Sequence, residues 1–276
     1  MTSPESIDPV AFHDFEQAGW QRASTYYSDT FGILTELATD SLLDAAGVHA
    51  GMRVLDVATG PGYVAGAAAQ RGATVVAVDF SSSMVAEARR RHPKIPFYEG
   101  DAEALSFPDR AFDAVVMNFG LLHLARPDAA LSEACRVLKL GGRYAFTVWA
   151  KPEEAVGFGV VLGAMQTHGT MDVGLPDGPP FFRFSEPDEC RRSLARAGFV
   201  SPDVGKLPLV WRLSSGDALF EVALHGGVRT SAALQAQTPQ ALAAIRRAVL
   251  SEIQAYADGE TIAVPMPVVL ASATRP

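Results

Sequence analysis

A turn with two closely spaced glycines follows the first apolar segment in the sequence VLDVATGPG, residues 54–62. Glycine permits a sharp turn and a close approach of the backbone to a ligand. The carboxylate of Asp56 beside this turn can neutralise an ammonium group, whereas it would repel a pyrophosphate, which binds to free N–H groups at a helix N-terminus. Gly60, Gly62 and Ala65 also satisfy the dinucleotide pattern G-x-G-x-x-G/A, which is weak by itself. Asp56 therefore favours a ligand with a cationic amino-acid part.

Two more acidic residues follow the next two apolar segments. Asp79 ends the β-branched segment 74–78, where an acidic side chain can accept two hydrogen bonds from a ribose diol. Asp101 follows a short segment at 97–98, so its carboxylate can accept a hydrogen bond from an adenine amino group while the N–H of Ala102 donates to the ring. These positions predict an adenosine-containing ligand, and they do not separate a nicotinamide dinucleotide from other adenosine cofactors.

Phe80 and Met84 follow Asp79 and can pack on the adenine face. The alternative is that both side chains belong to the core, and for Met84 the two interpretations have equal weight.

Apolar strands and amphipathic helices alternate between about residues 50 and 150. The pattern predicts strands at 52–57, 74–78, 97–98, 112–117 and 143–149, with helices at 63–70, 82–91 and 127–138. Repeated strand–helix units indicate a doubly wound parallel sheet with helices on both faces, an α/β fold. Ligands of such sheets bind outside the carboxyl ends of the strands. The chemistry is therefore expected in the residues that follow each strand.

The flanking regions are less regular. Residues 11–46 show helical periodicity, and residues 150–258 contain expected helices at 187–197, 217–224 and 239–257 with a strand at 204–213. A last apolar strand is expected at 261–271, where Pro265 and Pro267 indicate an edge or a bulge.

Composition excludes several classes of function. The 276 residues carry a formal net charge of -8, and the basic runs at 89–91 and 191–192 are expected on exposed helix faces, so nucleic acid is a poor candidate partner. Cys135 and Cys190 lie far apart and form no metal-ligand pattern, so we expect neither a metal site nor a disulfide. Residues 1–10 are polar and no segment is long enough to span a membrane. These features predict a cytoplasmic protein, as a monomer or a homodimer.

The motifs together resemble those of class I S-adenosylmethionine-dependent methyltransferases. The resemblance is carried by Asp56-(x)3-Gly60-x-Gly62, by Asp79, by the sequence GDA at 100–102, by FDAV at 112–115 and by Asn118-(x)4-His123. The small-molecule subgroup with the ubiquinone and menaquinone C-methyltransferases is the most similar. Residues 50–150 carry the resemblance strongly and the flanking regions only loosely.

The resemblance implies a Rossmann-like sheet of seven strands, mostly parallel with the last strand antiparallel, in a single domain spanning residues 1–276. Residues 11–46 would form lid helices, 50–150 the cofactor-binding core, 150–258 a helical roof over the acceptor with strand six, and 260–272 the final strand. Within the segment 20–27, Tyr26 and Tyr27 are candidates to cover the cofactor, although packing on the sheet is an equal alternative for both.

The implied cofactor is S-adenosyl-L-methionine, with S-adenosyl-L-homocysteine as the product. The Gly-rich turn would hold the methionine end, with Asp56 near its ammonium group, and the residues that follow strand four would lie beneath the sulfonium. The residues assigned to the cofactor are Asp56, Thr59, Gly60, Gly62, Asp79, Phe80, Met84, Asp101, Ala102, Asn118, Phe119 and Tyr27.

His123 is the candidate general base, because it follows the fourth strand near the expected position of the methyl group. The alternative is a structural role. The roof region is rich in large apolar side chains, namely Phe158, Met165, Phe181, Phe182, Phe184 and Trp211, which suit either a flat hydrophobic acceptor or a subdomain core.

Three functions remain open. The favoured one is in-line transfer of a methyl group to a small aromatic or hydrophobic acceptor, with proximity as the main catalytic effect. The second is a NAD-dependent oxidoreductase, against which stand Asp56 and the lack of a Tyr-x-x-x-Lys motif after strand four. The third is a module that binds S-adenosylmethionine without catalysis. The sequence does not indicate which acceptor is used or whether C, N or O is methylated.

Overall fold

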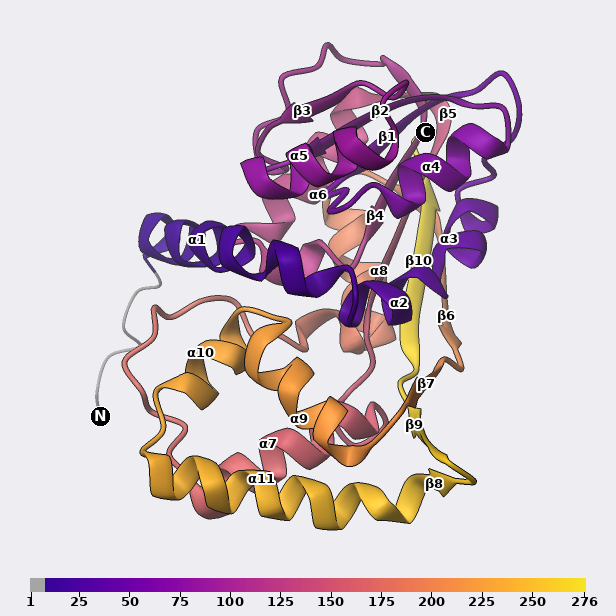
Figure 1. Cartoon of the computed structure of the whole chain (residues 1–276). Helices are drawn as coiled ribbons and strands as arrows, with labels where there is room; N and C mark the ends of the chain where they lie inside the picture. Colours follow the sequence, from indigo (N-terminus) through magenta and orange to yellow (C-terminus); the bar gives the residue numbers. More distant parts are fainter. Residues whose placement is uncertain (1–7) are drawn as a thin grey trace.

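A seven-stranded sheet forms the centre of the computed structural model, which describes residues 8–276 (Figure 1). Most of the N-terminal segment 1–10, in which no leader was expected, therefore lies outside the described residues. The strands are β1 (Arg53–Val57), β2 (Thr74–Asp79), β3 (Phe97–Glu99), β4 (Phe112–Asn118), β5 (Leu138–Trp149), β6 (Val200–Leu207) and β10 (Val268–Thr274). Their order across the sheet is β3-β2-β1-β4-β5-β10-β6.

The strand directions confirm the predicted sheet. The pairs β1–β2, β1–β4, β2–β3 and β4–β5 are parallel, whereas β10 is antiparallel to both β5 and β6. The predicted mostly parallel arrangement with an antiparallel last strand is therefore present. Strand order reverses between β1 and β4, and this switch point is where a ligand crevice is expected in such sheets.

Both faces of the sheet are buried, which explains the continuous apolar runs in the central strands. Successive side chains point to opposite faces, so Val54 enters one apolar cluster and Leu55 the other, and Ala114 and Val115 divide in the same way. The face that carries Val54 is covered by the helices α3 (Thr39–Ala45), α4 (Tyr63–Gln70) and α5 (Ser82–Arg91). The face that carries Leu55 is covered by α6 (Pro127–Val137) and α8 (Pro187–Arg196).

Helix α1 (Pro9–Tyr27) crosses the molecule between the sheet and a second group of helices (Figure 1). Asp8 caps its N-terminus, because one carboxylate oxygen accepts hydrogen bonds from the N–H groups of Val10 and Ala11. The short helix α2 (Phe31–Glu36) continues towards the sheet. The predicted helical region 11–46 thus forms three helices.

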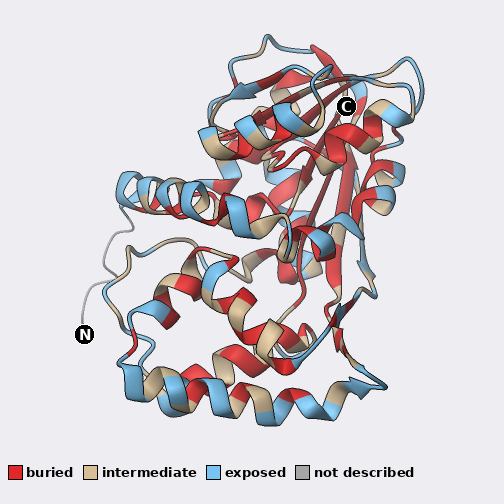
Figure 2. Cartoon of the chain, in the orientation of Figure 1, coloured by how far each residue is buried: buried red, intermediate tan, exposed pale blue. Residues whose placement is uncertain are grey.

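The second group of helices comes from the roof region, residues 150–258. Its members are α7 (Val156–His168), α9 (Gly216–His225), α10 (Arg229–Gln235) and α11 (Pro239–Ile253). A small antiparallel sheet of β7 (Val210–Leu213), β9 (Thr261–Pro265) and β8 (Ala257–Asp258) lies beside them. Helix α11 forms the outer edge and presents an exposed face to solvent (Figure 2). None of the helices in the described part of the chain has the length and apolar character to cross a membrane.

Two predicted strands are each divided by proline. The segment 204–213 was expected to form one strand, but it is divided between β6 and β7 in different sheets, with Pro208 between them. The segment 261–271 is divided between β9 and β10 around Pro265 and Pro267. Proline has no N–H to donate to a sheet, so each strand leaves the main sheet at this point. The two breaks are adjacent, because Met266 N donates to the carbonyl of Leu209 at 2.8 Å.

One boundary and two helices also differ from the prediction. The helix expected at 127–138 ends at Val137, and β5 begins at once with Leu138, so that the glycines at 141–142 lie inside the strand. Helices α7 and α10 were not predicted. Helix α7 is apolar on most of its surface and therefore lacks the polar stripe by which a surface helix is recognised.

Gly19 provides a test of how α1 packs on the roof. A Cβ atom at Gly19 would lie 2.3 Å from Cγ1 of Val228, whereas a Cβ at Gly163 in α7 would meet no atom within 4 Å. Alanine in a helix interior is normally favoured over glycine by about 1 kcal/mol. We therefore expect Gly163→Ala to stabilise the fold by roughly 0.5–1 kcal/mol and Gly19→Ala to destabilise it by roughly 1–3 kcal/mol through overpacking. Urea unfolding measures the free energy of unfolding of both variants relative to the parent. Equal stabilisation by the two substitutions would show that α1 is not held against Val228.

Candidate active site

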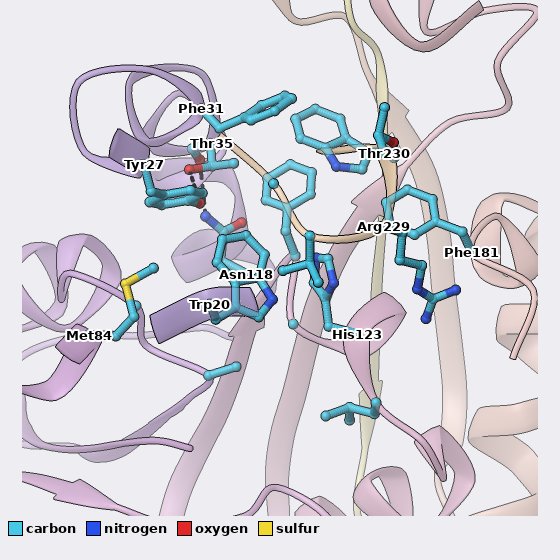
Figure 3. A pocket seen from close by; sticks show the side chains of 18 of the residues that line it. Trp20, Tyr27, Phe31, Thr35, Met84, Asn118, His123, Phe181, Arg229 and Thr230 are labelled. Carbon is cyan, nitrogen blue, oxygen red and sulfur yellow. Dashed lines mark hydrogen bonds between the residues drawn. The ribbon is translucent and has the colours of Figure 1, made fainter. Parts of the chain in front are cut away.

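One cavity lies at the carboxyl ends of the central strands, beneath α1 and α2 (Figure 3). It brings together most of the residues that were predicted to bind the cofactor. Those that line it are Tyr27, Gly60, Asp79, Phe80, Met84, Asp101, Ala102, Asn118 and Phe119, and the candidate base His123 lines it as well. The predicted residues Asp56, Thr59 and Gly62 do not line it.

The Gly-rich turn presents its backbone to the cavity at Gly60. This residue has φ +54°, and no atom lies within 4 Å of the position that a Cβ would take. Gly62 also has a positive φ and forms the N-cap of α4, but a Cβ there would lie 3.1 Å from Cζ of Phe97. Gly62 is therefore required for the turn and for packing against Phe97, and only Gly60 leaves room for a ligand.

Asp79 joins the first turn to the second. Its Oδ2 accepts a hydrogen bond from Gly60 N at 2.8 Å, and its Oδ1 accepts one from Ser81 N at 2.9 Å. Burial raises the pKa of Asp79 to about 6, against the effect of these two N–H donors, which lower it. Ser81 caps α5, because its side-chain oxygen accepts from Met84 N.

Asp56 is buried behind the turn and does not face the cavity. Its Oδ2 accepts a hydrogen bond of 2.6 Å from the hydroxyl of Thr59. Its Oδ1 has no hydrogen-bond partner within the described residues, and burial raises the pKa of Asp56 to about 7. The carboxylate thus supports the turn through Thr59, and Oδ1 is left as an unpaired buried acceptor next to the site.

The loop after β3 supplies a second acidic group. Oδ1 of Asp101 accepts from Glu103 N at 2.8 Å, which holds the side chain at the edge of the cavity, and Ala102 is buried beside it. Gly100 N donates to the backbone carbonyl of Asp79 at 3.0 Å, so this loop and the end of β2 form one connected wall.

Helix α1 covers that wall. The side-chain amide of Gln17 donates to the carbonyl of Phe80 at 2.8 Å, and the ring of His13 meets the Phe80 ring edge-on at 5.6 Å. Met84 is almost fully buried but still lines the cavity. Phe80 and Met84 thus both line the cavity and pack against neighbouring elements.

Asn118 and Phe119 hold the base of the cavity at the end of β4. The amide of Asn118 donates to the carbonyl of Thr35 at 3.0 Å and accepts from the hydroxyl of Thr147 at 2.5 Å. Phe119 has φ +55°, an unusual conformation for a large residue, and its ring stacks on Trp149 at 4.1 Å. The side chain of Asn118 therefore fixes α2 to the sheet and has little capacity left for a ligand.

The two lid tyrosines have different surroundings. The hydroxyl of Tyr27 shares a 2.8 Å hydrogen bond with Thr35, and burial raises the pKa of Tyr27 well above its usual value. Tyr26 is exposed and packs on His225 outside the cavity. Of the two candidates, only Tyr27 can contact a ligand in the cavity.

The remaining part of the cavity is aromatic. Phe31 of α2 stacks on Trp211 at 5.2 Å and on Phe158 at 6.2 Å, and Phe158 contacts Phe181 at 5.8 Å. Phe158, Phe181 and Trp211 were predicted from the roof sequence and do line the cavity. Met165, Phe182 and Phe184 were predicted with them but lie outside the lining, and Phe184 packs on Phe146 of β5. Phe31 was not predicted.

His123 lies between the two parts of the cavity and contacts charged residues that the sequence did not single out. Its Nδ1 lies 2.9 Å from Oε2 of Glu16 in α1, and Oε1 of Glu16 accepts from Nε of Arg229 in α10 at 2.7 Å. Glu16 lies 107 residues before His123 in the chain, and Arg229 lies 106 residues after it. No local motif connects them, so sequence reasoning could not find this contact.

The comparisons with known proteins agree with this geometry. Residues 55–146 match the family model described as a methyltransferase domain. The chain is 45% identical over 121 residues to demethylmenaquinone methyltransferase of Beutenbergia cavernae, over 42% of this chain and 50% of that protein. It is 45% identical over 108 residues to the ubiquinone/menaquinone biosynthesis C-methyltransferase of Chromobacterium violaceum, over 37% and 44% of the two chains. The chain thus spans about half the length of the curated relatives it matches.

A solved structure shares the fold over nearly the whole chain. Phosphoethanolamine N-methyltransferase 2 of Haemonchus contortus, in complex with phosphomonomethylethanolamine and S-adenosylhomocysteine, superposes with a TM-score of 0.58 at 20% identity, over 99% of this chain and 61% of that one. At this identity the likeness shows the fold alone. Together the matches confirm the predicted resemblance to class I S-adenosylmethionine-dependent methyltransferases similar to the quinone C-methyltransferases.

The buried Asp56 makes stability depend on pH. Its folded-state pKa of about 7 lies above the value near 4 of an unfolded aspartate, so the folded state holds the proton more tightly. This contribution to stability is complete below pH 4 and is lost as the pH rises through about 7. Asp56→Asn removes the titration and keeps an acceptor for Thr59. We expect the variant to gain roughly 2–4 kcal/mol relative to the parent between pH 4.5 and 7.5.

Urea unfolding at several pH values measures this difference. The matched control is Asp14→Asn, which changes an exposed aspartate of α1 and should keep a constant difference from the parent. A constant difference for Asp56→Asn as well would show that the Asp56 carboxylate is not buried as described.

Proposed function

We propose that this protein transfers a methyl group from S-adenosylmethionine to a small aromatic acceptor. The observation that carries the proposal is a single cavity with two chemically different parts. The part along the ends of β1 to β4 offers a glycine turn and two carboxylates, Asp79 and Asp101. The part beneath the roof is aromatic, with Phe31, Phe158 and Trp211.

The residues of the first part fit the cofactor. Gly60 leaves open space in front of its backbone, and Asp79 keeps lone pairs on both oxygens beyond the two N–H groups that it accepts. Asp101 and the N–H of Ala102 stand at the next wall, where an adenine would be held. Asp56 lies behind the turn, and above its pKa of about 7 its carboxylate adds negative charge there, which suits an ammonium group and disfavours a pyrophosphate.

The aromatic part fits a flat, apolar acceptor. Its rings meet one another at centroid distances of 5.2–6.2 Å, so they form a stiff wall instead of a flexible surface. An acceptor that is held against such a wall loses translational freedom, and this loss can supply much of the rate enhancement. The names of the demethylmenaquinone methyltransferase relatives agree with a quinol-type ring as the acceptor.

S-adenosylmethionine supplies the activated methyl group when it is bound. The chain's own residues then have three tasks: Gly60, Asp79 and Asp101 hold the cofactor, the aromatic wall orients the acceptor, and α1 with Tyr27 excludes water. His123 stands between the two parts, where it can hold a proton from the acceptor. We assign these roles to the residues as part of the proposal.

Two other functions remain to be tested against this one. A NAD-dependent oxidoreductase would place a pyrophosphate at the turn beside Asp56, an unfavourable pairing of like charges. A binding module without catalysis would need the first part of the cavity only, and the aromatic part would then have no ligand.

The first test compares thermal unfolding with S-adenosylhomocysteine, with NADH and with buffer alone. A ligand at 100 times its dissociation constant stabilises the folded state by about 2.7 kcal/mol, which raises Tm by several degrees. We expect a shift with S-adenosylhomocysteine and none with NADH. A shift with NADH alone would refute the proposed function, and binding without methyl transfer to any member of a phenol and hydroquinone panel would favour the binding module.

Asp79→Asn tests the ribose assignment. The substitution removes a charged acceptor and places an NH2 group against a backbone N–H, so we expect the dissociation constant for S-adenosylhomocysteine to rise roughly 10- to 150-fold, or about 1.5–3 kcal/mol, in calorimetry. Glu99→Gln is the matched control, because Glu99 ends β3 nearby but is exposed and lies outside the cavity lining. Its affinity should stay within about twofold of the parent. Equal affinity of Asp79→Asn and the parent would rule out the assignment.

A further inference from the structure

A fully buried carboxylate stands behind His123. Glu16 is 0% exposed, although it belongs to α1, most of whose polar side chains face solvent. One of its oxygens contacts Nδ1 of His123 and the other accepts from Nε of Arg229. The remaining nitrogens of Arg229 donate to the backbone carbonyls of Pro179 and Leu122, at 2.8 and 2.9 Å. Every polar group in this chain of contacts therefore has a partner except one nitrogen of His123.

The contact determines which nitrogen of His123 carries the proton. A carboxylate that is paired with a guanidinium is ionised and can only accept hydrogen bonds. Nδ1 must therefore be the protonated nitrogen of the neutral ring, and its lone pair lies on Nε2. Within residues 8–276, Nε2 has no hydrogen-bond partner, and His123 lines the cavity. Figure 3 shows the ring between Trp20 and the side chains of Phe181 and Arg229.

We propose that Glu16 is a positioning residue that holds His123 as a general base, and that the acceptor is an aromatic ring with a hydroxyl group. The inference rests on the proposed function and deepens it. The hydroxyl proton moves to Nε2 of His123, which becomes an imidazolium balanced by Glu16. The acceptor oxygen then forms a bond to the methyl carbon as the bond between that carbon and the sulfonium sulfur of S-adenosylmethionine breaks, so that neutral S-adenosylhomocysteine leaves. His123 afterwards releases the proton to water. Arg229 keeps Glu16 ionised and in place.

The surroundings of His123 favour a role as a general base over a purely structural role. The ring is flanked by Trp20 at 4.8 Å and by Phe181 at 5.7 Å, both edge-on, so apolar rings shield it from water. The charged groups that face it are Glu16 from α1 and, behind Glu16, Arg229 from α10. A purely structural role of His123, in which it only holds α1 against the core, would need the Nδ1 contact alone. Such a role does not explain why Nε2 is free at the cavity.

Glu16→Gln separates these two roles. The amide has one acceptor and one donor end, and Arg229 can only donate, so the amide oxygen must turn to Arg229. The NH2 group then faces Nδ1 of His123, which must become the acceptor, and the proton moves to Nε2. The variant keeps the size and both contacts of Glu16 but presents an N–H to the cavity in place of a lone pair.

The decisive measurement is the ¹⁵N NMR signal of the His123 ring in the full chain with bound S-adenosylhomocysteine, assigned with His123→Gln. In the parent protein we expect the Nδ1–H tautomer, and in Glu16→Gln the Nε2–H tautomer. Glu103→Gln is the matched control, because it alters another buried carboxylate that pairs with an arginine, Arg126, and should leave the tautomer unchanged. A parent ring with its proton on Nε2 would overturn the proposal even if Glu16→Gln did not fold.

The pH profile of methyl transfer to phenols of graded acidity gives a second readout. Below the pKa of a given phenol, Glu16→Gln and His123→Gln should lose roughly 10²- to 10⁴-fold in kcat, the usual contribution of a general base. Above that pKa the phenol is already ionised, so kcat of both variants should approach kcat of the parent. A loss that stays constant across pH would show that Glu16 and His123 act only in packing.

Calorimetry with S-adenosylhomocysteine separates failure of this inference from failure of the proposed function. If the parent does not bind S-adenosylhomocysteine, the proposed function fails and this inference with it. If the parent and Glu16→Gln bind it equally but the tautomer and the pH profile do not change, only the assignment of Glu16 and His123 is wrong.

Discussion

The site depends on the way in which one buried carboxylate, Asp79, is satisfied. Its two oxygens accept from Gly60 N and Ser81 N, and these hydrogen bonds fix the turn after β1 relative to the turn after β2. A buried charge without such donors would be costly, so the carboxylate and the two turns stabilise one another. The cost appears as a pKa raised to about 6, which leaves the group ionised near neutral pH and able to accept from a further ligand. The cofactor half of the cavity is thus formed by the sheet itself.

The acceptor half is formed in a different way, by segments that lie far apart in the chain. The polar contacts of Glu16, His123 and Arg229 connect helix α1, the 3₁₀ turn Leu121–His123 and helix α10. Glu16 is fully buried, and its carboxylate is paired there with the guanidinium of Arg229. The position of α1 over the sheet therefore also completes the polar contacts of His123. This arrangement links exclusion of water from the cavity to orientation of the ring.

This difference explains how much could be predicted from the sequence. The alternation of strands and helices, the glycine turn and the acid at the end of β2 follow from local patterns, and the sheet has the predicted order of directions. The strand breaks at Pro208 and at Pro265 to Pro267 depend on which sheet each half joins, and the local sequence pattern does not specify this. Asp56 was placed in the site from its position alone, whereas its side chain turns to Thr59. Glu16 and Arg229 carry no local signal, because each is informative only through its contact with the other.

The charges around the cavity also limit what the acceptor can be. Among the described residues that line it, Arg229 is the only arginine or lysine, and all three of its nitrogens already donate to Glu16, Pro179 and Leu122. An acceptor with a phosphate or carboxylate group would find no free cation, and burying its charge against Phe158 and Trp211 would be unfavourable. A neutral ring avoids this cost and still gains from contact with the aromatic wall. If such a ring carries a hydroxyl, its anion forms only as the proton leaves for His123, so the negative charge exists in the cavity only while a positive imidazolium is beside it.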